Sequence, residues 1–297
     1  MSGILLLGGT GQVGFELQRQ LCLSGEVHAP SRQELDLTDA AAVDTWLHRF
    51  QPGLIVNAAA YTAVDKAESE PHLAHRLNAE LPAQLAAYTQ SRNQWLVHYS
   101  SDYVYSGDAK HGDETRPWQE TSPAGPLSVY GKTKLEGDQA IQDSGCQHLI
   151  FRTSWVYSAR GHNFMNTMLR LGREREALGM VSDQIGAPTP ARLIALVTLQ
   201  ALTHQIEGGI YHLAPRGETS WHGFACEIFR QAHVLGEPLT ITPGQVSAIS
   251  SVQYPTPATR PLNSRLALEK LERALGVRLP SWQEQLALIL TERLSTQ

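Results

Sequence analysis

Tyr130 and Lys134 stand four positions apart in the stretch YGKTK at residues 130–134. On a helix this spacing places the phenol and the ammonium on one face. A neighbouring ammonium favours the phenolate, so it is expected to lower the pKa of Tyr130 towards the working pH. A phenol tuned in this way can give a proton to a carbonyl oxygen or take one from an alcohol. The pair also occurs by chance on solvated helix faces, so the surrounding elements must decide its meaning.

A glycine-rich turn lies near the N-terminus, between an expected strand and an expected helix. The apolar run 4–7 predicts a buried parallel strand, and Val13, Leu17 and Leu21 form the i, i+4, i+8 stripe of a helix. Glycines between the two permit a tight turn and close approach of a pyrophosphate to the helix N-terminus. The spacing is Gly-x-x-Gly-x-x-Gly rather than the standard Gly-x-Gly-x-x-Gly, so the strand-turn-helix context carries the prediction. The cofactor contacts expected here are Gly8, Gly11, Gln12, Val13 and Gly14.

The composition limits the classes of protein to which the chain can belong. Its 297 residues are enough for one large or two modest domains. A net charge of −5 and a pI of about 6.2 argue against a nucleic-acid partner held on a basic face. No apolar run of about 18 residues is present, so no membrane span is expected. Three widely spaced cysteines, no metal-ligand spacing and a first strand beginning near residue 3 favour a cytoplasmic protein without a signal peptide or metal site.

Strand and helix signals alternate along the first half of the chain. This alternation predicts βαβ units around a parallel sheet, and so an α/β fold. Small residues follow the strand expected at 54–56, where a cofactor can lie against the backbone. The expected strands are 4–7, 26–29, 54–56, 95–99 and 148–152. The expected helices are 39–50, with Thr38 as its N-cap, 71–92, and one opened by Tyr130 and Lys134.

The alternation weakens after residue 155. The segment YPTPATRP at 254–261 contains three prolines and cannot be a helix interior, so we expect a stiff, extended loop. Helices are expected around Phe164, Met168 and Leu171 and at 221–232, 266–275 and 282–294. Short strands are expected near Val181 and at 210–213.

Taken together, these stretches resemble the extended short-chain dehydrogenase/reductase superfamily and, within it, the dTDP-4-dehydrorhamnose reductase family. The glycine turn and Tyr-x-x-x-Lys mark the superfamily only. The stretches AVDKAE at 63–68 and RPLNSRL at 260–266 are much more specific to the family. Further matching stretches are GGTGQVG at 8–14, VNAAAYT at 56–62, HYSSDYVY at 98–105, PWQET at 117–121, FRTSWVY at 151–157 and DQIGAPT at 183–189.

The resemblance implies a Rossmann-type doubly wound parallel sheet with a smaller, discontinuous α/β substrate domain. The nucleotide-binding domain would cover 1–154 and a returning segment near 190–215, and the substrate domain 155–189 and 216–297. The implied reaction reduces the C4 ketone of dTDP-4-dehydro-L-rhamnose with NAD(P)H. The product, dTDP-L-rhamnose, donates rhamnose to cell-surface polysaccharide such as the O-antigen of lipopolysaccharide. The sequence leaves open a homodimer, Mg²⁺ at its interface, and the choice between dTDP and UDP.

Catalytic roles follow from the resemblance for Ser101, Tyr130 and Lys134. Ser101, where the family has Thr, would hydrogen-bond the ketone oxygen. Tyr130 would donate a proton to the forming alkoxide, and Lys134 would hold the cofactor ribose. His98 lies in an apolar strand and is expected to be a core histidine. The expected substrate contacts are Ser101, Asp102, Tyr103, Trp155, Gln184, Arg260 and Asn263, with Arg265 as a weaker candidate.

The residues after the second expected strand bear on the choice of cofactor. An acid there would bind the ribose 2′-OH of NADH, but this chain has Ser31 and Arg32. An Arg accommodates a 2′-phosphate, so NADPH is expected, with NADH also usable. Asp36 and Leu37 should lie near the adenine, as a similar pair does in the family. The other expected cofactor contacts are Ala58, Ala59, Ala60, Tyr61, Thr62, Tyr99, Tyr130 and Lys134.

Two other functions are compatible with these motifs. Nucleotide-sugar epimerases and dehydratases of the same superfamily share the glycine turn and the Tyr/Lys pair. The non-catalytic regulatory subunit of methionine adenosyltransferase also resembles this reductase family. The complete set of Ser101, Tyr130 and Lys134 argues against a regulatory role.

Overall fold

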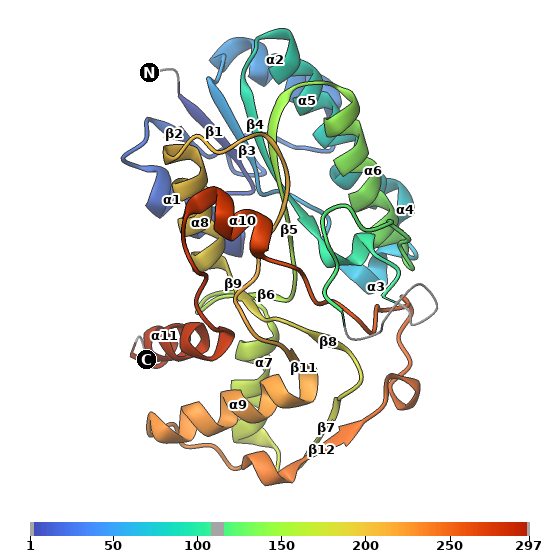
Figure 1. Cartoon of the computed structure of the whole chain (residues 1–297), viewed down its shortest axis with the longest axis vertical. Helices are drawn as coiled ribbons and strands as arrows, with labels where there is room; N and C mark the ends of the chain where they lie inside the picture. Colours follow the sequence, from blue (N-terminus) through green and yellow to red (C-terminus); the bar gives the residue numbers. More distant parts are fainter. Residues whose placement is uncertain (1–2, 108–115, 296–297) are drawn as a thin grey trace.

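A six-stranded parallel sheet organises the larger part of the computed structural model, which describes residues 3–107 and 116–295 (Figure 1). Its order is β10-β5-β4-β3-β1-β2, and all its pairings are parallel. The strand order reverses between β1 and β3, because β2 is added on one side of β1 and the later strands are added on the other side. Doubly wound sheets bind ligands at this position. The strands are β1 (Ile4–Leu7), β2 (Val27–His28), β3 (Leu54–Asn57), β4 (Trp95–Ser101), β5 (Gln147–Thr153) and β10 (Gly209–His212). The predicted fold class is confirmed.

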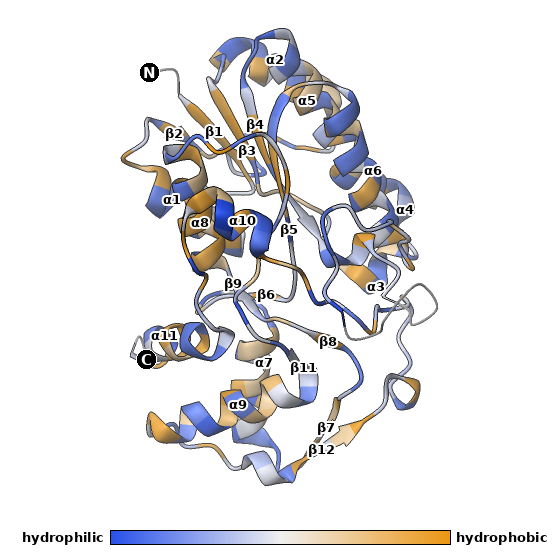
Figure 2. Ribbon diagram, in the orientation of Figure 1, coloured by the Kyte–Doolittle hydropathy of each residue, from blue (hydrophilic) through white to orange (hydrophobic). Residues whose placement is uncertain are grey.

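Both faces of this sheet are buried, which explains the apolar runs of its strands (Figure 2). Alternate residues of β1 point to opposite faces: Leu6 joins one core and Leu5 the other. The first core contains α1 (Gln12–Leu21) and α8 (Ala191–Thr203). The second contains α2 (Ala40–Phe50), α5 (Leu81–Ser91) and α6 (Val129–Asp143). The N-cap of α2 is Asp39, whose carboxylate accepts from two backbone N–H groups, and not Thr38 as predicted.

The helix predicted at 71–92 is interrupted. It consists of α4 (Pro71–His75), the π-helical turn η1 (Arg76–Glu80) and α5. Pro82 has no N–H to give to the carbonyl of Asn78, and a Cβ at Gly137 of α6 would lie 2.1 Å from that carbonyl oxygen. The π turn thus lets α6 pack closely against this helix. The leucines keep a spacing of four residues through the π turn, so the sequence pattern did not indicate the interruption.

Most elements after β5 other than α8, β10 and α10 form a second layer below the sheet in Figure 1. Its core joins α7 (Phe164–Glu174), α9 (Trp221–Val234) and α11 (Trp282–Ser295). Its strands are β6 (Val156–Tyr157), β7 (Leu178–Val181), β8 (Ile185–Gly186), β9 (Thr189–Pro190), β11 (Thr219–Ser220) and β12 (Val246–Ile249), which form three two-stranded sheets.

The C-terminal part of the chain does not stay within this second layer. Helix α10 (Glu269–Leu275) buries Leu271 and Leu275 in the core of the large sheet. It begins at Glu269 rather than at the predicted Leu266. Among the described residues, no helix is long and apolar enough to cross a membrane.

Candidate active site

A cavity of about 1030 Å³ lies where the strand order reverses between β1 and β3. Its walls come from the ends of β1, β3 and β4, from the start of α6, and from Trp155 and Trp221 of the second layer. Most predicted site residues line it: Gly8, Gly11, Gln12, Val13, Arg32, Asp36, Leu37, Ala58, Ala59, Ala60, Tyr61, Thr62, Tyr99, Ser101, Asp102, Tyr103, Tyr130, Lys134 and Trp155. Six do not line it: Gly14, Ser31, Gln184, Arg260, Asn263 and the weaker candidate Arg265.

The glycine turn leaves one end of the cavity open to a ligand. Gly8 has φ +78°, and a Cβ there would lie 2.7 Å from the backbone of Ala58. A Cβ at Gly14 would lie 2.1 Å from the carbonyl oxygen of Gly8, so Gly14 supports the turn from beneath. Gly11 caps α1 without a side chain, which leaves the first N–H groups of the helix free for an anion. This arrangement fits the pyrophosphate of a dinucleotide.

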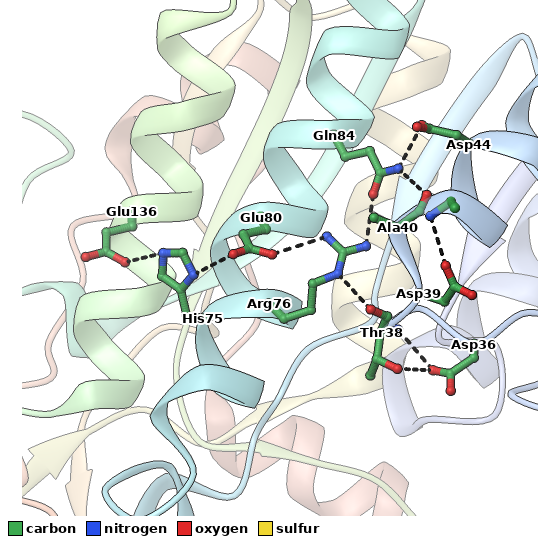
Figure 3. A network of polar contacts seen from close by, with 11 residues as sticks. Asp36, Thr38, Asp39, Ala40, Asp44, His75, Arg76, Glu80, Gln84 and Glu136 are labelled. Atoms are coloured by element: carbon green, nitrogen blue, oxygen red, sulfur yellow. Dashed lines mark hydrogen bonds and ion pairs between the residues drawn. The ribbon is translucent and has the colours of Figure 1, made fainter.

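A polar network holds the segment 36–38 at the wall of the cavity (Figure 3). Asp36 accepts hydrogen bonds from the backbone N–H and the hydroxyl of Thr38, at 2.9 and 2.8 Å. Arg76 of η1 donates to the carbonyl of Thr38 at 3.2 Å and to Gln84 at 2.9 Å. The π turn therefore connects the expected adenine side of the cavity to α5.

Ser31 and Arg32 have different environments. Arg32 is exposed and lines the cavity, as the cofactor hypothesis requires. The backbone N–H of Ser31 instead donates to the carboxylate of Glu34 at 2.7 Å, and this bond lowers the pKa of Glu34. No acid directly follows β2 in the sequence, but the turn brings the carboxylate of Glu34 to Ser31 from three residues away.

Helix α6 presents Tyr130 to the cavity. Ser128 caps the helix by accepting from the N–H of Gly131 at 3.1 Å. A Cβ at Gly131 would lie 2.2 Å from the carbonyl oxygen of Tyr103, so this glycine lets α6 approach the turn η2 (Asp102–Val104). As a result the rings of Tyr103 and Tyr130 meet edge to face, with centroids 5.5 Å apart.

The pKa of Tyr130 is raised, contrary to the expectation that Lys134 would lower it. Burial of the phenol is the main cause, and a hydrogen bond with Ser101 opposes it. Burial also raises the pKa of Tyr103, to about 12. In the described structure the phenol of Tyr130 therefore keeps its proton at neutral pH.

Lys134 is almost completely buried at the back of the cavity. Its Nζ donates to the carbonyl oxygen of Tyr99 at 2.7 Å and lies 3.2 Å from Nε2 of His98. Burial lowers the pKa of Lys134 to about 8, although the nearby carboxylate of Asp138 acts in the opposite direction. His98 is buried as predicted, but it contacts Lys134 rather than only the core. Its position within an apolar strand gave no signal of this contact.

Asp102 lies beside Ser101 with its carboxylate buried. Its Oδ1 accepts from the hydroxyl of Ser101 at 3.0 Å, whereas Oδ2 is buried without a hydrogen bond in the described structure. Burial raises the pKa of Asp102 to about 6. The hydroxyl of Ser264 also interacts with this carboxylate and opposes the rise in its pKa. No cluster of three or more His, Cys, Asp or Glu side chains that could hold a metal occurs among residues 3–107 and 116–295.

Trp155 and Trp221 stack where the second layer borders the cavity, with ring centroids 3.8 Å apart and planes 13° from parallel. Trp155 adopts φ 48°, an uncommon conformation for a residue with a side chain. Gln184 accepts a hydrogen bond from the indole N–H of Trp221 at 3.1 Å. Gln184 thus supports the cavity wall from behind, and Trp221, which was not predicted, forms part of that wall.

The other three predicted substrate residues that do not line the cavity bind protein groups. Arg260 forms an ion pair with Asp65, with Nη2 2.8 Å from Oδ2. The side-chain amide of Asn263 donates to the carbonyl of Arg116 at 2.9 Å and accepts from the N–H of Arg265 at 3.2 Å. The guanidinium of Arg265 binds Glu218, at 2.6 Å from Nε. Asn263 and Arg265 therefore hold neighbouring segments together.

A doubly wound parallel sheet with Ser101, Tyr130 and Lys134 around the cavity at its switch point defines a Rossmann-type oxidoreductase of the short-chain dehydrogenase/reductase superfamily. The RmlD substrate binding domain family model matches residues 1–295. The chain therefore belongs to the dTDP-4-dehydrorhamnose reductase family, as its motifs predicted.

Individual relatives agree with this assignment. The dTDP-4-dehydrorhamnose reductase of Salmonella typhimurium is 46% identical over 301 residues, covering 99% of this chain and 98% of that protein. A crystal structure of dTDP-4-dehydrorhamnose reductase from Bacillus anthracis in complex with NADP is 31% identical. It has a TM-score of 0.88 and covers 98% of this chain and 99% of that one. A Clostridium acetobutylicum structure described as a dTDP-4-dehydrorhamnose reductase is 35% identical, with a TM-score of 0.88 over 99% of this chain and 100% of its own.

Proposed function

We propose that this chain reduces the C4 ketone of dTDP-4-dehydro-L-rhamnose to dTDP-L-rhamnose with NADPH. The observation that carries the proposal is the convergence of Ser101, Tyr130 and Lys134, from β4 and α6, on one cavity beside the glycine turn. The names of the relatives supply the substrate, because the cavity alone does not specify a sugar.

A bound reduced nicotinamide supplies the hydride. The Ser101 hydroxyl hydrogen-bonds the ketone oxygen, and Tyr130 donates its phenolic proton as negative charge develops there. A raised pKa suits this direction of reaction, because it keeps Tyr130 protonated before the reaction. The ammonium form of Lys134 stabilises the phenolate that remains.

The cofactor choice rests on the open end of the cavity. The free N–H groups of α1 bind the pyrophosphate, and Arg32 pairs with the 2′-phosphate of NADPH. NADH remains usable, because the pyrophosphate contacts do not depend on the extra phosphate. The relative from Bacillus anthracis, solved with NADP, supports this assignment.

The substrate side is assigned to the second layer and the rim of the cavity. Asp102, Tyr103 and Trp155 contact the sugar, and Arg260 binds the diphosphate once released from Asp65. Gln184 supports the cavity wall through Trp221, and Asn263 joins neighbouring segments. The nucleotide-binding unit covers 1–154 and 190–215, and the substrate unit covers 155–189 and 216–297. Helix α10 departs from this division, since its leucines pack in the core of the large sheet.

The decisive experiment follows NADPH absorbance with dTDP-4-dehydro-L-rhamnose as the substrate. The proposal requires stoichiometric NADPH oxidation and formation of dTDP-L-rhamnose. A purified protein that retains NAD⁺ through complete cycles would instead indicate an epimerase or dehydratase. No turnover together with tight binding of a protein partner would indicate a regulatory subunit.

A further inference from the structure

His98 contacts the amine of Lys134 and is completely buried on β4. Its Nε2 is 3.2 Å from Nζ of Lys134, and its Nδ1 is 3.2 Å from Nδ2 of Asn57 on β3. Burial and the charge of Lys134 keep the pKa of His98 well below its ordinary value. The imidazole is therefore neutral and carries a proton on only one nitrogen.

Asn57 determines which nitrogen carries that proton. Its Oδ1 accepts a hydrogen bond from the backbone N–H of Ala59 at 3.2 Å, which fixes the orientation of the amide. Nδ2 therefore faces His98, and an amide nitrogen can only donate. Nδ1 of His98 must accept this bond, so the imidazole proton lies on Nε2 and points towards Nζ of Lys134.

We propose that His98 is a positioning residue for Lys134, and that Asn57 holds the imidazole in the tautomer whose Nε2–H faces the lysine amine. An N–H group pointing at an ammonium is unfavourable, whereas it can donate to the lone pair of a neutral amine. His98 thus favours release of a proton from Lys134 at a pH near neutrality. The tautomer of His98 does not depend on the proposed reaction, but the effect of this tautomer on catalysis rests on the proposed function.

The other groups around Lys134 differ in whether they favour its ammonium form. Asp138, one turn further along α6, favours the ammonium, but its carboxylate is shared with Arg152 of β5 at 2.9 Å. The carbonyl of Tyr99 accepts from Nζ in either protonation state. Tyr130 on α6 and Asp102 after β4 line the same cavity. Within this set, His98 is the side chain whose donor hydrogen opposes the ammonium, and Asn57 maintains that arrangement.

The tautomer can be measured without any turnover. Long-range ¹H–¹⁵N correlation spectra of protein labelled with ¹⁵N-histidine distinguish Nε2-protonated, Nδ1-protonated and cationic imidazoles. We expect His98 to be neutral with its proton on Nε2, with its signals identified by their loss in H98Q. In N57D, a carboxylate replaces the amide donor, and the proton is expected to move to Nδ1. A cationic or Nδ1-protonated His98 in the unmodified protein overturns the proposal.

The consequence for Lys134 is read from the pH profile of kcat/KM for the ketosugar at saturating NADPH. H98Q can turn its amide oxygen to the ammonium, and N57D leaves Nε2 as an acceptor. Both changes are expected to raise the pKa of Lys134, so the alkaline limb of the profile should shift to higher pH by about one unit or more. A hydrogen bond to a charged group shifts the pKa of that group by about this amount. The matched control is H148Q, because His148 hydrogen-bonds the carbonyl of Cys146 and does not contact Lys134.

The outcomes separate this inference from the proposed function. An alkaline limb that stays in place in both H98Q and N57D, or moves equally in H148Q, overturns the inference while the reductase activity stands. No turnover by the unmodified protein overturns the proposed function, and the tautomer spectra then decide the inference alone. If H98Q does not fold, N57D retains every imidazole, and the signal that moves identifies His98.

Discussion

Arg260 and Asp65 are 195 residues apart in the chain, yet Nη2 of Arg260 lies 2.8 Å from Oδ2 of Asp65. The same carboxylate accepts from the backbone N–H of Ala258 at 3.2 Å. Asp65 thereby ties the proline-rich segment 254–261 to the short helix α3 (Val64–Ala67). Val64 and Lys66 line the cavity, so this ion pair lies at its rim. A substrate diphosphate would have to take the guanidinium from Asp65.

Arg260→Ala is expected to raise KM for the nucleotide sugar about 10- to 100-fold and to change KM for NADPH about twofold or less. A charge-assisted hydrogen bond to a diphosphate is worth about 1.5–3 kcal/mol, whereas a partly exposed ion pair contributes about 0–1 kcal/mol. Steady-state kinetics with each ligand varied in turn measure both values. Asp65→Asn is the matched control: it should leave KM for the sugar unchanged or lower it. Equal increases in KM for the sugar in the two variants would mean that Arg260 only holds its segment against α3 and does not bind the substrate.

Tyr130→Phe should reduce kcat by about a hundred- to ten-thousand-fold, the usual contribution of a general acid. The ring and its contact with Tyr103 are retained, so NADPH affinity should stay close to that of the unmodified protein. Turnover and cofactor fluorescence titration provide the two readings. A variant with more than half of the original kcat would exclude Tyr130 as the acid.

Arg32→Ala and Glu34→Gln should shift cofactor preference in opposite directions. Loss of Arg32 removes a partner of the 2′-phosphate and should lower kcat/KM for NADPH about tenfold, with little effect on NADH. Loss of the Glu34 charge removes a carboxylate hydrogen-bonded to Ser31 and should raise the NADPH-to-NADH ratio severalfold. Both cofactors are to be measured with each variant. An unmodified protein that prefers NADH, or equal losses for both cofactors in Arg32→Ala, would contradict this assignment.

Lys134→Met should alter the pH dependence of stability. The pKa of Lys134 is about 8 in the folded protein and about 10.4 in the unfolded chain, so the unfolded state binds more protons between these values. The penalty for burying the charge is fully present below pH 8 and is relieved as the pH rises towards 10.4. From pH 8 to pH 10, the unmodified protein should gain about 2 kcal/mol of unfolding free energy relative to Lys134→Met. Urea unfolding at both pH values measures this difference, and parallel curves for the two proteins would refute it.

The sequence by itself determined the features that depend on local spacing. The alternation of strands and helices predicted the parallel sheet. The glycine turn between a strand and a helix predicted a nucleotide-binding site, and the helical spacing of Tyr130 and Lys134 predicted that both lie on one helix face. These features are readable because helix pitch and strand pleat are properties of the backbone. The family-specific stretches at 63–68 and 260–266 then indicated the reductase family.

Only the tertiary structure decided which side chains meet. His98 contacts Lys134 and Asn57 across 36 and 41 residues of chain, because parallel pairing places β3 beside β4 and α6 packs over them. The pKa of Tyr130 is raised because the fold buries the phenol, which the spacing to Lys134 could not indicate. Arg260 pairs with Asp65 because the fold brings the segment 254–261 beside α3, which local spacing could not indicate either. Local spacing sets which residues share a face, whereas burial and contacts between distant segments set their charge and their partners.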